Sequence, residues 1–207
     1  MYVHSSASPR VVAVSTQTDD VDLVDGDVTV NFARAAMLAA LVGAFAYVSF
    51  PNPVSPAANV TLQVLGVFLA GALLGPKWGT ASLLLYLAAG SLGAPIFSGG
   101  AAGFGHLLGS TGGYLLSYPL AAGLVGAVAH GGLRTVPREE IPIWRLVAGM
   151  VGGIVVIYAF GMGGLMVVVG YSLPKAFAVG AAAFIPAEAV KLAAAVGIVR
   201  SDALAVE

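Results

Sequence analysis

Cysteine is absent from this sequence of 207 residues, and charged residues are few. Without cysteine, the chain has no disulfides, thiolate metal sites, iron–sulfur clusters or cysteine nucleophiles. Only 9 % of the residues are charged and 58 % are hydrophobic, whereas an average soluble protein has roughly 25 % charged residues. So few charges cannot coat a globule of this size with a water-soluble surface, and the composition therefore predicts a protein embedded in lipid.

Sequence motifs of the common enzyme classes are also missing. There is no G-x-x-x-x-G-K-[ST] loop for ATP, no H-E-x-x-H metal motif and no G-x-S-x-G nucleophile. His4, His106 and His130 lie far apart in the sequence and do not predict a metal site. We therefore expect neither an enzyme nor a protein that depends on a metal or cofactor, and nothing indicates nucleic-acid binding.

The first thirty residues differ from the rest of the chain. They contain five aspartates against Arg10 alone, are rich in Ser and Thr, and show no sustained apolar period. This composition is typical of a disordered tail, and the basic start and apolar stretch of a signal peptide are missing. We predict a disordered acidic cytoplasmic tail over residues 1–30, with partner binding as an alternative role, and a transmembrane domain over 31–207.

Long uncharged blocks follow Arg34, since residues 35–76, 78–133 and 146–174 contain no charge. A helix needs about 20 apolar residues to cross a bilayer, so the longer blocks must fold back on themselves, with breaks where Pro and Gly cluster. The sequence thus predicts an all-α membrane protein with six transmembrane helices, at residues 32–50, 57–75, 80–97, 111–130, 143–161 and within 176–200.

The basic residues predict the orientation of these helices. With six spans and the N-terminus inside, the inner side receives Arg10, Arg34, Lys77, Arg134, Arg138, Arg145 and Arg200. The outer side receives only Lys175. Because short cytoplasmic loops carry an excess of Lys and Arg, we expect both termini to be cytoplasmic.

Two segments are candidates for a ligand site near the outer surface. Residues 99–113 contain seven glycines and no charge, which indicates either a lid packed over apolar surface or a compact re-entrant connection without a ligand. Glu188 and Lys191 share a helical face within apolar sequence. Ionisable residues inside a membrane are energetically costly unless they are paired or solvated. Glu188 and Lys191 therefore either bind a ligand or form an ion pair that only tethers the helix. Gln63 can both donate and accept hydrogen bonds, which suits an amide-like ligand.

A row of small residues marks the first predicted helix. Ala36, Ala40 and Ala44 are spaced four apart, and such spacing lets another helix approach closely. The row serves either internal packing or docking to a separate membrane subunit.

Several motifs, in this order and spacing, resemble those of one family. They are Thr-Leu-Gln at 61–63, Gly-Ala-Pro-Ile-Phe at 93–97, Thr-Gly-Gly-Tyr-Leu at 111–115 and Pro-Ala-Glu-Ala-Val-Lys at 186–191. Over about residues 32–200 the chain resembles the BioY family, the biotin-binding S component of energy-coupling factor (ECF) vitamin transporters. The resemblance implies the six-helix S-component fold in the plasma membrane and a biotin site near the outer surface.

The resemblance also implies roles for individual residues. The ligand would be biotin, with no further cofactor, and the binding residues would be Gln63, Tyr86, Phe97, Ser98, Tyr114, Glu188 and Lys191. The small-residue row of Ala36, Ala40 and Ala44 would dock to a transmembrane coupling subunit, itself carried by two ATPase subunits that supply the energy for uptake.

The chain departs from the family pattern at two positions. Glu188 stands where the family commonly has Asp, and Ser98 with Gly99 occupies a region that often carries Asn. Two functions from other classes stay open: a self-sufficient secondary transporter of biotin or another small vitamin, and a structural assembly factor whose small-residue rows only pack helices. Secondary transporters usually show inverted repeats and several midplane charges, which this sequence lacks.

Overall fold

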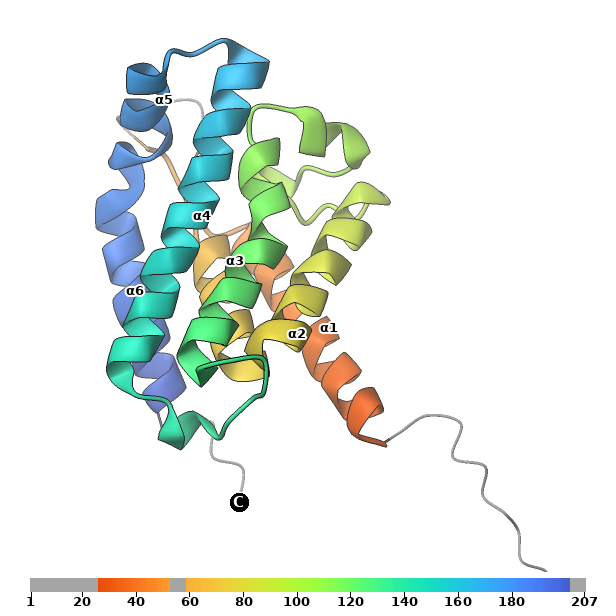
Figure 1. Cartoon of the computed structure of the whole chain (residues 1–207). Helices are drawn as coiled ribbons and strands as arrows, with labels where there is room; N and C mark the ends of the chain where they lie inside the picture. The colour runs from red at the N-terminus through yellow and green to blue at the C-terminus, as the bar shows by residue number, and fades with distance from the viewer. Residues whose placement is uncertain (1–25, 53–58, 202–207) are drawn as a thin grey trace, which may run out of the picture.

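The computed structural model describes residues 26–52 and 59–201, and helices account for most of them (Figure 1). The long helices are α1 (Gly26–Phe45), α2 (Gln63–Ser91), α3 (Gly112–His130), α4 (Ile143–Val169), α5 (Leu173–Gly180) and α6 (Ile185–Arg200). The short elements are an antiparallel pair, β1 (Ser49–Phe50) with β2 (Val60–Thr61), and the 3-10 turns η1 (Ser98–Gly100), η2 (Phe104–Leu108), η3 (Arg138–Glu140) and η4 (Ala182–Phe184).

The described residues contain five helical segments long and apolar enough to cross a membrane. Four of them are α1, α2, α3 and α4, and the fifth is the stretch Leu173–Arg200 that joins α5 to α6. The chain is thus a multi-pass membrane protein, as its composition predicts.

Helix α2 is a hairpin of two arms. Gly75 has φ 74° and ψ −177°, a conformation that breaks the helix just before Pro76. A Cβ atom on Gly79 would lie 2.8 Å from the carbonyl oxygen of Ala70, so the chain reverses and its arms, residues 63–74 and 76–91, lie against each other. The break predicted at Gly75-Pro76 is confirmed, and the two helices predicted around it join directly at this turn.

Other predicted boundaries were wrong by several residues. Helix α1 begins at Gly26 and ends at Phe45, so residues 26–30 of the predicted tail are helical; residues 1–25 lie outside the described range. Helix α4 continues eight residues beyond the predicted end at 161, because only at Gly170, with φ 74°, does a left-handed cap stop it. The last predicted helix is divided into α5, η4 and α6, with Pro186 in the first turn of α6.

Close contacts of small residues hold α2 against α3. A Cβ atom on Gly71 would meet the carbonyl oxygen of Ala122 at 2.4 Å, and one on Gly126 would meet the Pro76 nitrogen at 2.5 Å. Neither site has room for a side chain, which is how helices approach closely in lipid. The hairpin therefore lies at the centre of the molecule, whereas α1 is largely exposed.

The two ends of the molecule carry different charge. The α2 turn, the α3–α4 connection and the end of α6 lie together at one end, and the α4–α5 connection lies at the other (Figure 1). At the first end, the His130 imidazole bonds the Ala72 carbonyl oxygen at 3.1 Å, and the Arg138 guanidinium donates to the Ser201 carbonyl at 2.9 Å. Lys77, Arg134, Arg138, Arg145 and Arg200 belong to this basic end, and Lys175 belongs to the other.

Candidate ligand-binding site

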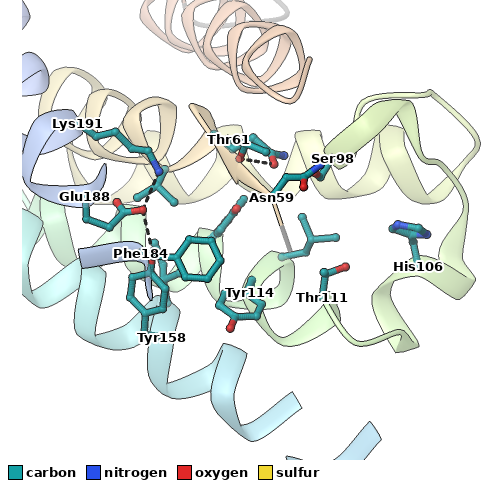
Figure 2. Close-up of a pocket in the computed structure, with 15 residues that line it drawn as sticks. Asn59, Thr61, Ser98, His106, Thr111, Tyr114, Tyr158, Phe184, Glu188 and Lys191 are labelled. Carbon is teal, nitrogen blue, oxygen red and sulfur yellow. Dashed lines mark hydrogen bonds and ion pairs between the residues drawn. The ribbon is translucent and has the colours of Figure 1, made fainter. Parts of the chain in front are cut away.

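A cavity of about 280 Å³ opens near the end opposite the basic one (Figure 2). Helices α2, α3, α4 and α6 and the connection between α2 and α3 all contribute to it. It is lined by Asn59, Thr61, Gln63, Val64, Ser98, His106, Thr111, Tyr114, Leu115, Tyr118, Ile157, Tyr158, Phe184, Glu188 and Lys191. Its volume is at the lower end of the range for small-molecule sites, so it suits a small solute.

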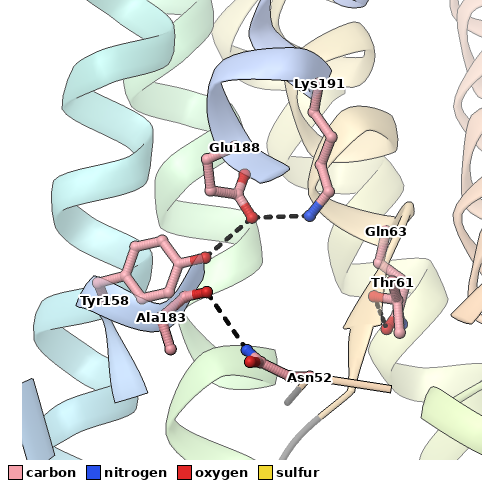
Figure 3. A network of polar contacts seen from close by, with 7 residues as sticks. All are labelled: Asn52, Thr61, Gln63, Tyr158, Ala183, Glu188 and Lys191. Carbon is pink, nitrogen blue, oxygen red and sulfur yellow. Dashed lines mark hydrogen bonds and ion pairs between the residues drawn. The ribbon is translucent and has the colours of Figure 1, made fainter. Parts of the chain in front are cut away.

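One end of the cavity holds a buried ion pair. Lys191 Nζ lies 2.7 Å from Glu188 Oε1, and the two side chains are 5 % and 3 % exposed. The Tyr158 hydroxyl donates to the same oxygen at 2.8 Å (Figure 3). Their positions on the first turns of α6 bring both charges to one face, as the three-residue spacing predicts.

The second oxygen of the Glu188 carboxylate is unsatisfied. Glu188 Oε2 is buried and has no hydrogen-bond partner among the described residues. A buried acceptor without a partner costs about 1–3 kcal/mol, and more when it is charged. Because Glu188 lines the cavity, a ligand with an N–H or O–H group is the kind of partner that would remove this cost.

A second set of polar groups lines the α2 side of the cavity. The Thr61 hydroxyl donates to Gln63 Oε1 at 3.0 Å, and Gln63 Nε2 donates to the Tyr86 hydroxyl at 2.5 Å. Tyr86 donates in turn to the carbonyl oxygen of Ile96 at 3.1 Å. The amide of Gln63 is therefore held on both sides, not free to rotate.

Five of the seven predicted binding residues line the cavity: Gln63, Ser98, Tyr114, Glu188 and Lys191. Tyr86 and Phe97, which the resemblance puts among the binding residues, do not line it. Both are 0 % exposed and pack edge to face, with ring centroids 5.6 Å apart. They lie behind the wall, because the Gln63 side chain stands between the Tyr86 hydroxyl and Thr61.

The aromatic wall consists largely of residues that the predicted set leaves out. Tyr114 and Tyr158 are edge to face at 6.0 Å, and Phe184 lies 5.9 Å from Tyr158. Tyr118 follows Tyr114 by one helical turn and thus faces the same way. That spacing was the available signal for Tyr118, whereas the place of Phe184 depends on the break between α5 and α6.

The connection between α2 and α3 forms one side of the cavity. Ser98, His106 and Thr111 line it, and Leu107 is buried. Phe104 and Leu108 are 62 % and 65 % exposed, however, so the segment packs only some of its apolar side chains against the rest of the protein. Outside this segment, Asn52 Nδ2 donates to the carbonyl oxygen of Ala183, the residue before the lining Phe184, at 3.4 Å (Figure 3).

The site offers binding groups. No cluster of His, Asp and Glu able to hold a metal is found in residues 26–52 and 59–201. The cavity presents a carboxylate, an ammonium group, hydroxyls and an amide beside aromatic rings. Such a site can hold a ligand with both polar and apolar parts.

The predicted docking residues lie away from this cavity. Ala36, Ala40 and Ala44 are all exposed along one face of α1. This row takes no part in the core, whereas Ala35, Ala39 and Val42 of the same helix are buried. The helix therefore packs with one face and leaves the small-residue row free to meet another chain or lipid.

Comparisons with known proteins agree on one family. The BioY family model matches residues 15–206. A probable biotin transporter BioY of Pyrococcus horikoshii is 39 % identical over 137 residues, which are 66 % of this chain and 75 % of that protein. The biotin transporter BioY of Thermotoga maritima is 35 % identical over 162 residues, 78 % of this chain and 89 % of that protein.

A solved structure shares the fold. The crystal structure of the S-component for biotin from an ECF-type ABC transporter superposes with a TM-score of 0.74 at 24 % identity, covering 86 % of this chain and 93 % of that one. The relatives are named as transporters, in keeping with the missing catalytic motifs. This chain belongs to the BioY family.

Proposed function

We propose that this protein captures biotin in the cavity near its outer surface, as the substrate-binding subunit of an ATP-driven uptake system. The observation that carries the proposal is the buried Glu188–Lys191 pair at the cavity, with Glu188 Oε2 unpartnered in the described structure. The relatives are named biotin transporters, and we take the identity of the ligand, biotin, from those names.

The chemistry of biotin suits the lining groups. Its ureido ring carries two N–H donors on either side of a carbonyl acceptor, and its thioether ring is apolar. Glu188 Oε2 accepts from a ureido N–H, and Lys191 donates to the carbonyl or to the ligand's carboxylate. Tyr114, Tyr158 and Phe184 pack against the rings. The pair thus serves the ligand in addition to tethering α6, and no cofactor is needed.

The energy for uptake comes from other chains. The sequence has no P-loop. As the family resemblance implies, ATP hydrolysis takes place on two ATPase subunits that act through a transmembrane coupling subunit. The exposed row of Ala36, Ala40 and Ala44 is the docking face for that subunit, because it offers close approach to a helix.

The arms of the α2 hairpin count as two of six spans in this proposal. With α1, α3, α4 and the α5–α6 segment, they put both termini in the cytoplasm and the basic end inside the cell. The cavity then opens to the outside of the plasma membrane, where vitamin is collected.

Isothermal titration of the purified chain in detergent tests the proposal. We expect biotin to bind without nucleotide, and Lys191→Ala to weaken binding at least tenfold, or ~1.4 kcal/mol. Lys175→Ala is the matched control, since this exposed lysine at the same end lies outside the cavity, and its affinity should match that of the unchanged protein. Absence of biotin binding would refute the proposal. Biotin uptake by vesicles that contain this chain and no ATPase would instead favour a secondary transporter.

A further inference from the structure

Tyr86 has a buried hydroxyl that no direct contact with a ligand explains. The residue is 0 % exposed and does not line the cavity. Its hydroxyl nevertheless joins the Gln63 amide to the carbonyl oxygen of Ile96, at 2.5 Å and 3.1 Å. It is therefore the inner end of a chain of hydrogen bonds whose outer end, Thr61, is at the cavity.

The chemistry of these groups sets the donor-to-acceptor direction of this series of hydrogen bonds. The Ile96 carbonyl can only accept, so the single proton of Tyr86 points to it. The Tyr86 oxygen must then accept from Gln63, which turns the amide nitrogen inwards and Oε1 towards Thr61. Thr61 donates its only hydroxyl proton to Oε1 and has just lone pairs left for other partners.

The opposite direction would change the cavity wall. If the Gln63 amide were reversed, its nitrogen would donate to Thr61, and the Thr61 proton would be free to donate to a ligand. The Tyr86–Ile96 contact favours the first arrangement, because Tyr86 has one proton, and giving it to an inward amide oxygen would leave the Ile96 carbonyl without this donor. A buried residue thus decides whether Thr61 is an acceptor or a donor.

We propose that Tyr86 is a positioning residue that makes Thr61 a hydrogen-bond acceptor at the cavity wall, so that the site selects a ligand with N–H groups for both Thr61 and Glu188. Lys191 supplies a donor to the same cavity. Two acceptors and one donor match the N–H, C=O, N–H sequence of a cyclic urea. The inference rests on the proposed function and extends it to the specificity of the site.

The test removes the Tyr86 hydroxyl and keeps its ring. Tyr86→Phe preserves the aromatic packing against Phe97 and Tyr118. Ser82→Ala is the matched control: Ser82 lies one turn earlier in α2, is equally buried, and donates to the Ala35 carbonyl at 2.8 Å, unconnected to the cavity. Tyr86→Phe loses two buried hydrogen bonds and Ser82→Ala loses one, both at fully buried hydroxyls of the same helix.

Biotin affinity is measured by titration for the unchanged protein, for the single variants Tyr86→Phe and Thr61→Val, and for the variant that carries both changes. We expect each single change to weaken binding about threefold to tenfold and the double variant to be no weaker than Thr61→Val, because Tyr86 acts through Thr61. Ser82→Ala should keep its affinity. A purely structural role of Tyr86 would not produce this non-additivity.

Other outcomes separate the two proposals. An unchanged affinity of Tyr86→Phe, or losses that add up in the double variant, overturns the inference while Lys191→Ala still tests the proposed function. Should Tyr86→Phe not elute as a single folded species, Thr61→Ser keeps the hydroxyl that Thr61→Val removes, and equal biotin affinities of these two variants overturn the inference. Failure of the unchanged protein to bind biotin overturns the proposed function itself.

Discussion

Glu188 is the residue on which the cavity's charge depends. Its Oε1 accepts from both Lys191 and Tyr158, at 2.7 Å and 2.8 Å. An unpaired carboxylate at this depth would be strongly unfavourable, and the two donors offset that cost. They also hold the carboxylate in one orientation, in which Oε2 has no partner among the described residues.

Removal of the Tyr158 donor should therefore weaken ligand binding. We expect Tyr158→Phe to lower biotin affinity roughly tenfold, or about 1.5 kcal/mol, since a hydrogen bond to a charged group is lost while the ring stays in place. Titration in detergent measures the effect. Tyr171→Phe, the same change at the same end but outside the cavity, should bind normally; an equal loss in both variants would contradict the role given to Tyr158.

At the scale of the elements, the α2 hairpin positions most of the site. Its first arm carries Gln63 and Val64 at the cavity, and its second arm carries Tyr86 behind them. The turn at Gly75-Pro76 packs on Gly126 of α3, where there is no room for a methyl group. Helix α3 in turn presents Tyr114 and Tyr118, so the spacing of these helices sets the width of the cavity.

A methyl group at this contact should destabilise the fold. We expect Gly126→Ala to cost about 1–3 kcal/mol of stability, because its Cβ atom would overlap with backbone that cannot move aside easily. Gly163→Ala in α4 has open space around it and should be neutral or stabilising by about 0.5–1 kcal/mol. The midpoint of thermal aggregation, followed by size-exclusion chromatography, compares the two, and equal midpoints would argue against the close contact.

At the scale of the whole molecule, charge separates two ends. Five basic residues gather around the α2 turn, the α3–α4 connection and the end of α6, and the cavity lies towards the other end. In the proposed function, where the basic loops stay in the cytoplasm, this arrangement directs the cavity outwards. The exposed alanine row of α1 runs between the two ends, on a separate face from the cavity.

Labelling can test this orientation directly, because the chain has no cysteine of its own. In intact cells, a membrane-impermeant maleimide should modify Lys175→Cys and leave Arg134→Cys unmodified until the membrane is permeabilised. Both positions are exposed, so burial does not explain a difference between them. The reverse pattern would put the cavity on the cytoplasmic side and contradict a role in capture from outside.

The sequence by itself determined the features that depend on composition and local spacing. The scarcity of charge predicts embedding in lipid, Gly75-Pro76 predicts the break in α2, and the three-residue spacing predicts that Glu188 and Lys191 share a face. Each of these predictions depends only on composition or on residues within one or two helical turns of each other. The structure agrees with all three.

Only the tertiary structure decided which side chains line the cavity. Tyr86 and Phe97 lie behind the wall, Tyr118 and Phe184 are in it, and Glu188 Oε2 lacks a partner among the described residues. In a soluble helix, the polar face reveals which way each residue points. These helices are apolar on every side because lipid replaces water, so their rotation is set by close packing with helices distant in the sequence.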